Sequence, residues 1–272
     1  MIERSIALLG GTPVGYATRE HPAWTKMPER FTSIGAELRP GARTSARLDA
    51  LFGMVEDAAR ADGTQKVTAW AWEHDALMIE VLRGRGFCEE RRERFWELDL
   101  VAGRERIAKM AAASRERMRR DGIHVLTLAN DADPGKFEKL KRMSDEAEAD
   151  VPSSEPYVPL EMREFMEWFK SPGLRPDRIW LARQGDDIVG ISQLSYPPVR
   201  GVVATDWTGM ARKARGRGIA RALKCETLMQ AIALGVDRVR TDNDSTNVPI
   251  LHINETMGYK RRPDGIQFLK AL

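Results

Sequence analysis

The sequence predicts a protein of the α/β class, with an α+β arrangement around mixed sheets and two similar domains in tandem. Strand-like and helix-like segments alternate along the chain, and two stretches 172 positions apart share one pattern. The 272 residues suffice for one large or two ordinary domains. With 42% hydrophobic and 31% charged residues, the composition is that of a folded globular protein and not of a disordered chain.

The internal repeat keeps one register, without gaps, from position 38 to position 87. The aligned pairs are Leu38 with Met210, Arg43 with Arg215, Leu51 with Leu223, Gly63 with Gly235, Val67 with Val239, and Gly86-Phe87 with Gly258-Tyr259. Chance rarely preserves a register over such a length. The repeat therefore predicts two copies of one supersecondary unit.

The first copy, expected at residues 1–100, follows the order strand, hairpin, strand, long helix, strand, short helix and final strands. Residues 101–121 are charged and alanine-rich, with strong helix propensity and Gly122 as a stop, so we expect a helical linker there. Its arginines are typical of a solvated helix face, and a nucleic-acid patch is the alternative.

The second copy, expected at residues 122–272, holds a segment that the first copy lacks. From residue 122 to about 175 the chain reads as a strand, GIHVLTL, followed by two helices. The first of them opens at Asp133-Pro134, an N-cap followed by proline, and the second is LEMREFMEWFK. The first copy is therefore expected to lack its initial strand and two helices.

Composition and spacing argue against several function classes. Lys and Arg number 43 against 40 Asp and Glu, a balance that disfavours a protein built mainly to coat nucleic acid. No apolar run reaches the roughly 18 residues of a membrane span, and MIERSIALLGG does not resemble a signal peptide. Two isolated cysteines and four histidines without HExxH spacing predict no disulfide and no metal. We expect a cytoplasmic protein without membrane or nucleic-acid partners, whose oligomeric state stays open.

The segment R-G-R-G-I-A-R, residues 215–221, lies between a strand that ends near Met210 and a helix that ends near Leu234. Its glycines let backbone N–H groups turn inward at a helix N-terminus, where the helix dipole favours anions. Arg212 and Lys213 add positive charge, so a di- or triphosphate is the natural ligand. An ordinary strand-to-helix turn with basic flanks is the alternative.

Three phosphate-binding motifs compete for this turn. A P-loop requires GxxxxGK[ST], which the chain does not contain. A dinucleotide fingerprint requires a third glycine at the position of Arg221, which weakens this interpretation. It is not eliminated, because Asp242 follows at a distance that suits an acidic residue binding a ribose. The third motif, [QR]xxGx[GA], is matched by Arg215, Gly218 and Ala220. These residues resemble the acyl-CoA loop of the GNAT superfamily of N-acyltransferases.

A second motif strengthens the resemblance. The family pattern NxxAxxLYxxxGF is matched by Asn247, Ile250, Ile253, Asn254, Gly258 and Tyr259. The resemblance covers residues 122–272 as a full domain and residues 1–100 as an incomplete one, and the tandem resembles the mycothiol synthase type of architecture. It implies transfer of an acetyl group from acetyl-CoA to a primary amine, by direct attack in a ternary complex and without a metal.

The resemblance also implies the residues that bind the co-substrate. Backbone N–H groups of the turn would hold the pyrophosphate, and the Met210 N–H would polarise the thioester carbonyl. Asn243 and Asn247 are candidates for amide contacts to the pantetheine arm, with helix capping as the alternative. The expected set is Met210, Arg212, Arg215, Gly216, Arg217, Gly218, Ile219, Ala220, Arg221, Asn243 and Asn247.

The catalytic groups depart from the family pattern. Asn254 stands where the family often has a tyrosine acid, and an amide can donate a hydrogen bond to sulfur but cannot protonate it. We expect His252 to point away from Asn254 on the same helix. Asp206 is the candidate for taking the proton of the amine, and by strand alternation either Asp206 or Trp207 faces the cleft.

The acceptor side is expected to be acidic, because the run DEAEADVPSSE at 145–155 contains five acids and no base. These acids are Asp145, Glu146, Glu148, Asp150 and Glu155. Together with Asp206 and Trp207 they would attract a small cationic amine, and a solvated helix end is the alternative.

The first copy is expected not to bind acyl-CoA. It has RTSARL, residues 43–48, where the second copy has RGRGIA, and the added Cβ atoms would crowd a pyrophosphate. We therefore expect an N-acetyltransferase with one active site, in the second copy. A non-catalytic acyl-CoA-binding or sensor module is the alternative, and a basic nucleic-acid-binding protein comes third.

Overall fold

The computed structural model describes residues 2–21, 24, 27, 29–154, 157–197 and 202–272. The chain divides into two compact units. Unit 1 comprises Met1–Arg94, Ser153–Val158 and Pro263–Leu272, and unit 2 comprises Phe95–Pro152 and Pro159–Arg262. Both are mixed α/β units, which confirms the expected fold class. None of the helices within the described residues is long and apolar enough to span a bilayer.

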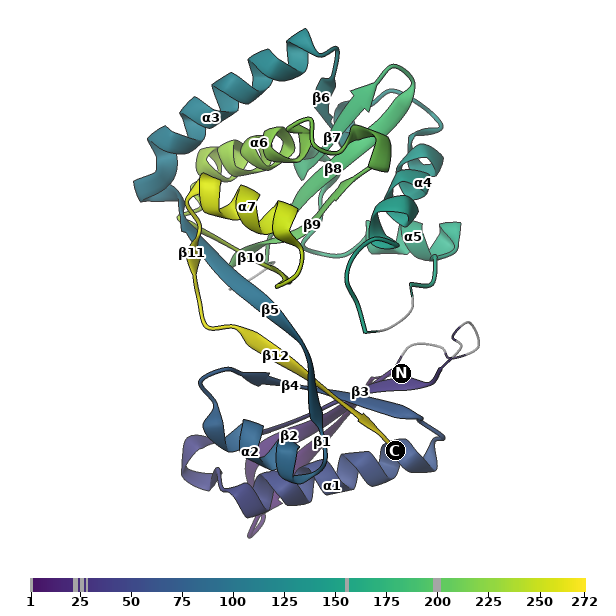
Figure 1. Ribbon diagram of the computed structural model, residues 1–272, viewed down its shortest axis with the longest axis vertical. Helices are drawn as coiled ribbons and strands as arrows, with labels where there is room; N and C mark the ends of the chain where they lie inside the picture. Colours follow the sequence, from purple (N-terminus) through teal and green to yellow (C-terminus); the bar gives the residue numbers. More distant parts are fainter. Residues whose placement is uncertain (1, 22–23, 25–26, 28, 155–156, 198–201) are drawn as a thin grey trace. The chain divides into compact units, whose positions relative to one another are not determined.

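Unit 1 is a mixed sheet with helices α1 and α2 (Figure 1). Its elements are β1 (Ile2–Leu9), β2 (Thr12–Glu20), β3 (Phe31–Leu38), α1 (Ser45–Ala61), β4 (Lys66–Trp72), α2 (Ala76–Gly84), the first part of β5 (Cys88–Asp99), and β12 (Gly265–Ala271). The sheet order is β1-β2-β3-β4-β12-β5. The strand β2 buries side chains such as Ala17 and Arg19 on one face and exposes Tyr16 on the other.

The last strand of unit 1 comes from the C-terminus of the chain. The strand β12 runs antiparallel to both neighbours, with Phe268 opposite Ala69 of β4 and opposite Glu89 of β5. Pairing on both edges satisfies the backbone N–H and C=O groups of a strand that lies inside a sheet. The compact units therefore differ from the expected boundaries 1–100, 101–121 and 122–272, because strand pairing assigns residues 263–272 to unit 1.

Unit 2 contains the segment that unit 1 lacks. Its elements are α3 (Leu100–Arg120), β6 (His124–Thr127), α4 (Lys136–Glu148), α5 (Met162–Trp168), β7 (Ile179–Gln184), β8 (Asp187–Ser195), β9 (Val203–Met210), α6 (Ile219–Ala233), β10 (Arg238–Asp244), α7 (Val248–Met257) and β11 (Lys260–Arg261). The strand and the two helices expected between residue 122 and about 175 are β6, α4 and α5. Helices α4 and α6 both pack against β8, which is buried along nearly its whole length.

The helix predicted at 101–121 is confirmed as α3, but the structure makes it part of unit 2 and not a free linker. Its buried residues Ile107, Ala111, Ser114 and Met118 recur at helical spacing and form one face. This face packs along α6, as Figure 1 shows. On the rest of the helix, Arg104, Arg119 and Arg120 are exposed.

Strands β9 and β10 separate after a short parallel contact. They pair at Val203 with Val239 and at Ala204 with Arg240, and no further pair is found among the described residues. On its other edge, β9 stays paired with β8 as far as Met210, across a bulge between Thr205 and Trp207. The separation opens the sheet beside residues 207–210 and positions the site described next.

Candidate functional site

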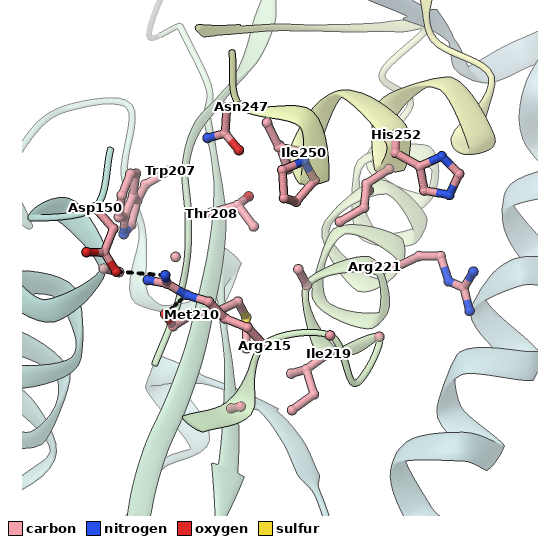
Figure 2. A pocket seen from close by; sticks show the side chains of 18 of the residues that line it. Asp150, Trp207, Thr208, Met210, Arg215, Ile219, Arg221, Asn247, Ile250 and His252 are labelled. Atoms are coloured by element: carbon pink, nitrogen blue, oxygen red, sulfur yellow. Dashed lines mark hydrogen bonds and ion pairs between the residues drawn. The ribbon is translucent and has the colours of Figure 1, made fainter. Parts of the chain in front are cut away.

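A cavity of about 560 Å³ occupies the opening beside β9 (Figure 2). Its walls come from the end of β9, the turn before α6, the first turn of α6, one face of α7, the end of α4, and α3. Ten of the residues expected at the site line it: Asp150, Trp207, Met210, Arg215, Gly216, Gly218, Ile219, Ala220, Arg221 and Asn247. The fold thus gathers residues far apart in sequence into one place.

The turn before α6 is shaped for an anion. Gly216 (φ +74°) and Gly218 (φ +82°) both adopt the left-handed conformation that L side chains rarely adopt. Gly218 is the N-cap of α6 and has no side chain to accept from the first-turn N–H groups. The residues of this first turn, Ile219, Ala220 and Arg221, line the cavity. An uncapped helix N-terminus at a cavity wall is suited to bind phosphate.

The corresponding turn of unit 1 is closed by its own residues. Helix α1 begins two positions earlier than α6 in the aligned register, and Thr44 is its N-cap. The Thr44 hydroxyl accepts from the Arg47 N–H at 3.3 Å, so this helix end is capped by the chain. Arg43, the counterpart of Arg215, forms an ion pair with Asp75.

The edge of β9 that faces away from β8 offers a backbone for an extended ligand. Residues 207–210 line the cavity and have no strand neighbour on that edge among the described residues. Asn247 and Ile250 of α7 face them across the opening (Figure 2). Asn247 is the N-cap of α7 but makes no side-chain capping bond, so its amide is available to a ligand. An extended amide-containing chain could add here in the manner of a strand.

Glu146 and Asp150 lie beside the basic turn, whereas they were expected on the acceptor side. Asp150 accepts from Arg212 at 2.7 and 2.8 Å and from Arg215 at 2.7 Å. These guanidinium groups hold the pKa of Asp150 far below its usual range. Glu146 accepts from the backbone N–H of Arg212. The end of α4 packs against the turn, so these two carboxylates neutralise its arginines and are not directed toward a separate acceptor mouth.

Asp145 and Glu148 do not line the cavity. Asp145 pairs with Lys141 at 2.6 Å, one helical turn away. Glu148 is half-buried, and burial, followed by the nearby Asp145, raises its pKa. Glu155 lies outside the described residues.

The structure places Asn254 in the core, where it is fully buried and does not line the cavity. Its Nδ2 donates to Asn243 Oδ1 at 2.7 Å, so the two amides that were expected to reach the co-substrate bind each other. This corrects the expected contact between Asn254 and sulfur. The helical period points Asn254 inward and His252 outward, and His252 lines the cavity wall.

Strand alternation separates Asp206 from Trp207, as expected, and Trp207 is the one that lines the cavity. Asp206 is exposed at the bulge and accepts from Gln193 Nε2 at 2.6 Å. Arg217 points out of the cavity and donates to Gln184 at 2.8 Å. Arg212 is likewise outside the lining.

Sequence reasoning did not find Arg117, Thr208 or Thr256, all of which line the cavity. Arg117 is the most consequential, because the linker arginines were interpreted as a solvated face. A signal was present: Arg117 follows Ser114 by three positions and precedes Met118, which places it at the margin of the buried stripe of α3.

Comparisons with known proteins agree with this geometry. Residues 140–259 match the Acetyltransferase (GNAT) family, and this segment contains every lining residue except Arg117. A match to this family implies acyl transfer from an acyl-CoA. A comparison with curated proteins finds no matching sequence.

Solved structures share the fold along nearly the whole chain. A GCN5-related N-acetyltransferase from Sphaerobacter thermophilus is 17% identical with a TM-score of 0.71, covering 96% of this chain and 78% of that one. A tandem GNAT protein from the clavulanic acid biosynthesis pathway is 15% identical with a TM-score of 0.75, covering 100% and 83%. A glucosamine N-acetyltransferase region of a fungal multi-domain β-N-acetylglucosaminidase is 13% identical with a TM-score of 0.74, covering 98% and 33%. The likeness shows a tandem GNAT fold.

Proposed function

Because the chain carries a GNAT acetyltransferase domain in residues 140–259, we propose that it transfers an acetyl group from acetyl-CoA to a primary amine on a small molecule. One observation carries the proposal: an uncapped helix N-terminus with two left-handed glycines opens beside an unpaired strand edge. The first feature suits a pyrophosphate, and the second suits the amides of pantetheine.

The residues present suit acyl-CoA. The N–H groups of Ile219, Ala220 and Arg221 would hold the pyrophosphate, and the β9 main chain with Asn247 would hold the pantetheine arm. The Met210 backbone N–H would then stabilise the charge that develops on the thioester oxygen. The apolar Ile250 and Ile253 would shield the arm from water, which strengthens these polar contacts.

The reaction requires a neutral amine to attack the thioester carbon. A C–N bond forms, the C–S bond breaks, the amine loses a proton, and the sulfur leaves as a thiolate that water protonates. Asp206 does not line the cavity, so it is proposed to accept the amine proton only through a water, because it is exposed on the strand that leads to Met210. Glu146 and Asp150 bind the turn, so they do not supply the negative charge that was expected to attract a cationic acceptor.

Unit 1 is proposed to have no catalytic role. Its helix N-terminus is capped by Thr44, and its arginine is held by Asp75. The second candidate function is a non-catalytic acyl-CoA-binding or sensor module, which the burial of Asn254 favours, because no titratable acid occupies that position.

Two measurements test the proposal. Titration calorimetry with CoA should give one site per chain, and two equal sites would show that the turn at Thr44 also binds. Turnover of acetyl-CoA with a panel of primary amines should release free thiol. Tight binding without turnover on any amine would favour the sensor function, and absence of binding would overturn both candidates.

A further inference from the structure

One face of the sheet in unit 1, called here the open face, carries large apolar side chains that are exposed. Helices α1 and α2 both pack on the opposite face, where Phe52, Leu82 and Ala17 belong to one buried cluster (Figure 1). Successive side chains of a strand point to opposite faces, so those between the buried positions point to the open face. Its exposed apolar side chains are Ile2, Ile6 and Leu8 of β1, Tyr16 of β2, and Trp70 and Trp72 of β4.

The corresponding positions of unit 2 lie in its core. In the hairpin of β1 and β2, Ile6 lies opposite Tyr16. In the hairpin of β7 and β8, Leu181 lies opposite Ile191 at the same spacing along the chain, and both are completely buried in a cluster with residues of α4 and α5. By contrast, Ile6 is 71% exposed and Tyr16 is 48% exposed. Within its described residues, unit 1 has no helices that correspond to α4 and α5, so its open face is a surface that unit 2 buries.

The open face is large enough for a stable interface. From their exposed fractions, its apolar side chains present roughly 700 Å², against about 800 Å² per partner in a standard protein–protein interface. The largest apolar patch on a typical monomer is smaller, about 300–600 Å². Three of the six side chains are aromatic, a type that is enriched in interface cores.

The polar side chains of the open face carry both signs of charge. Arg4 lies on β1, Glu20 lies opposite Ile2 on β2, and Glu37 lies opposite Tyr16 on β3. All three charged side chains are exposed, and no ion pair joins them to another residue in the part of the chain that the structure describes. In a two-fold symmetric interface each surface meets its own copy, so a surface with apolar groups and both charges can complement itself.

We propose that the open face of unit 1 binds the open face of a second copy of the chain, forming a two-fold symmetric dimer. The apolar side chains of the two sheets interdigitate, as in other sheet-on-sheet packings, and the arginine of each copy is attracted by the carboxylates of the other. None of the residues of the open face lines the cavity beside β9, so this inference does not depend on the proposed function.

Analytical ultracentrifugation over a range of protein concentrations tests the proposal. The unaltered protein should dimerise at micromolar concentration, because interfaces of this size have dissociation constants in about the micromolar range or below. Ile6→Asp and Tyr16→Asp should each weaken the dimer at least about tenfold, since each would bury an unpaired carboxylate in the interface. Both side chains are exposed in the single chain, and an unchanged circular dichroism spectrum shows that each variant is folded.

Met54→Asp is the matched control, because Met54 is 46% exposed on α1, which packs on the opposite face of the same sheet. This variant should dimerise like the unaltered protein. Arg4→Glu adds a third carboxylate beside Glu20 and Glu37, so it should weaken the dimer more at low salt than at about 0.5 M salt. A protein that stays monomeric at all concentrations would overturn the proposal. A dimer that survives both Ile6→Asp and Tyr16→Asp, or that Met54→Asp weakens equally, would overturn it as well.

Discussion

Asp150 at the end of α4 accepts a 2.7 Å hydrogen bond from Arg215, the first residue of the glycine turn. The same carboxylate also binds Arg212. A negative charge therefore lies at the wall of the cavity in which the pyrophosphate is proposed to bind.

Asp150→Asn should raise the affinity for CoA about two- to fivefold at low salt, because it removes a like charge from the mouth of the phosphate site. The gain should shrink between low ionic strength and about 0.5 M salt, since exposed charges are screened. Calorimetry at both salt concentrations measures it.

The control for this prediction is Asp187→Asn, which breaks a similar exposed pair with Lys213 but lies outside the cavity. Weaker CoA binding by Asp150→Asn would show that the carboxylate serves mainly to hold Arg215 in place.

Gly218→Ala should cost about 1–2 kcal/mol of unfolding free energy and weaken CoA at least tenfold. The alanine would be strained at φ +82°, and its methyl would displace Arg117 from the turn. Gly235→Ala is the matched control, because Gly235 ends the same helix at φ +77° with open space around it. The control should lose the same stability and keep its affinity. Parallel chemical denaturation and calorimetry distinguish the two, and equal loss of affinity in both would contradict a local role for Gly218.

Asn254→Ala should destabilise the protein by about 1–2 kcal/mol without changing CoA affinity, because Asn254 is buried and leaves Asn243 unpaired when removed. In a double-mutant cycle with Asn243→Ala, the two losses should be non-additive by about 1 kcal/mol. Urea unfolding measures both. A lower turnover with unchanged stability would place Asn254 at the sulfur after all.

Lys224→Met should stabilise the protein by about 1–3 kcal/mol at pH 7, because Lys224 is completely buried without a hydrogen-bond partner among the described residues. Burial lowers the pKa of Lys224 to about 8 from its ordinary 10.5. The folded state therefore binds fewer protons than the unfolded state between these values, and the unaltered protein gains stability as pH rises from about 8 to 10.5.

The advantage of Lys224→Met should consequently shrink over that pH interval. Urea titrations at pH 7, 8.5 and 10 measure the difference between the two proteins. Lys170→Met, at a side chain that is 68% exposed, is the control and should show no such trend. A constant advantage across the interval would mean that Lys224 titrates normally.

Much of the candidate site follows from local sequence. The two glycines of the turn were predictable, because only glycine adopts the left-handed conformation at Gly216 and Gly218 without strain. Met210 and Asn247, which the family resemblance assigned to the site, both line the cavity. The spacing of apolar residues was sufficient to predict β6, α4 and α5, the elements that distinguish the second copy from the first.

Other features depend on which surfaces meet in space. Nothing in the sequence distinguishes Asp150 from the other acids of residues 145–155. Only the packing of the end of α4 against the turn makes Asp150 a partner of Arg215. The motif position of Asn254 does not give the orientation of its side chain. Ile253, the preceding residue of α7, lines the cavity, whereas Asn254 faces the core, because adjacent positions on a helix point in different directions.

The sequence alone determined the fold class, the tandem repeat, and the second copy as the one with a glycine turn before its long helix. These are local properties of periodicity and backbone conformation, and each can be read within a short window of residues. The tertiary structure alone decided that β12 completes unit 1, that α3 brings Arg117 to Gly218, and that the acidic run neutralises the turn. Such contacts join residues that are often a hundred or more positions apart, and neither propensity nor spacing encodes which of many possible long-range pairs will form.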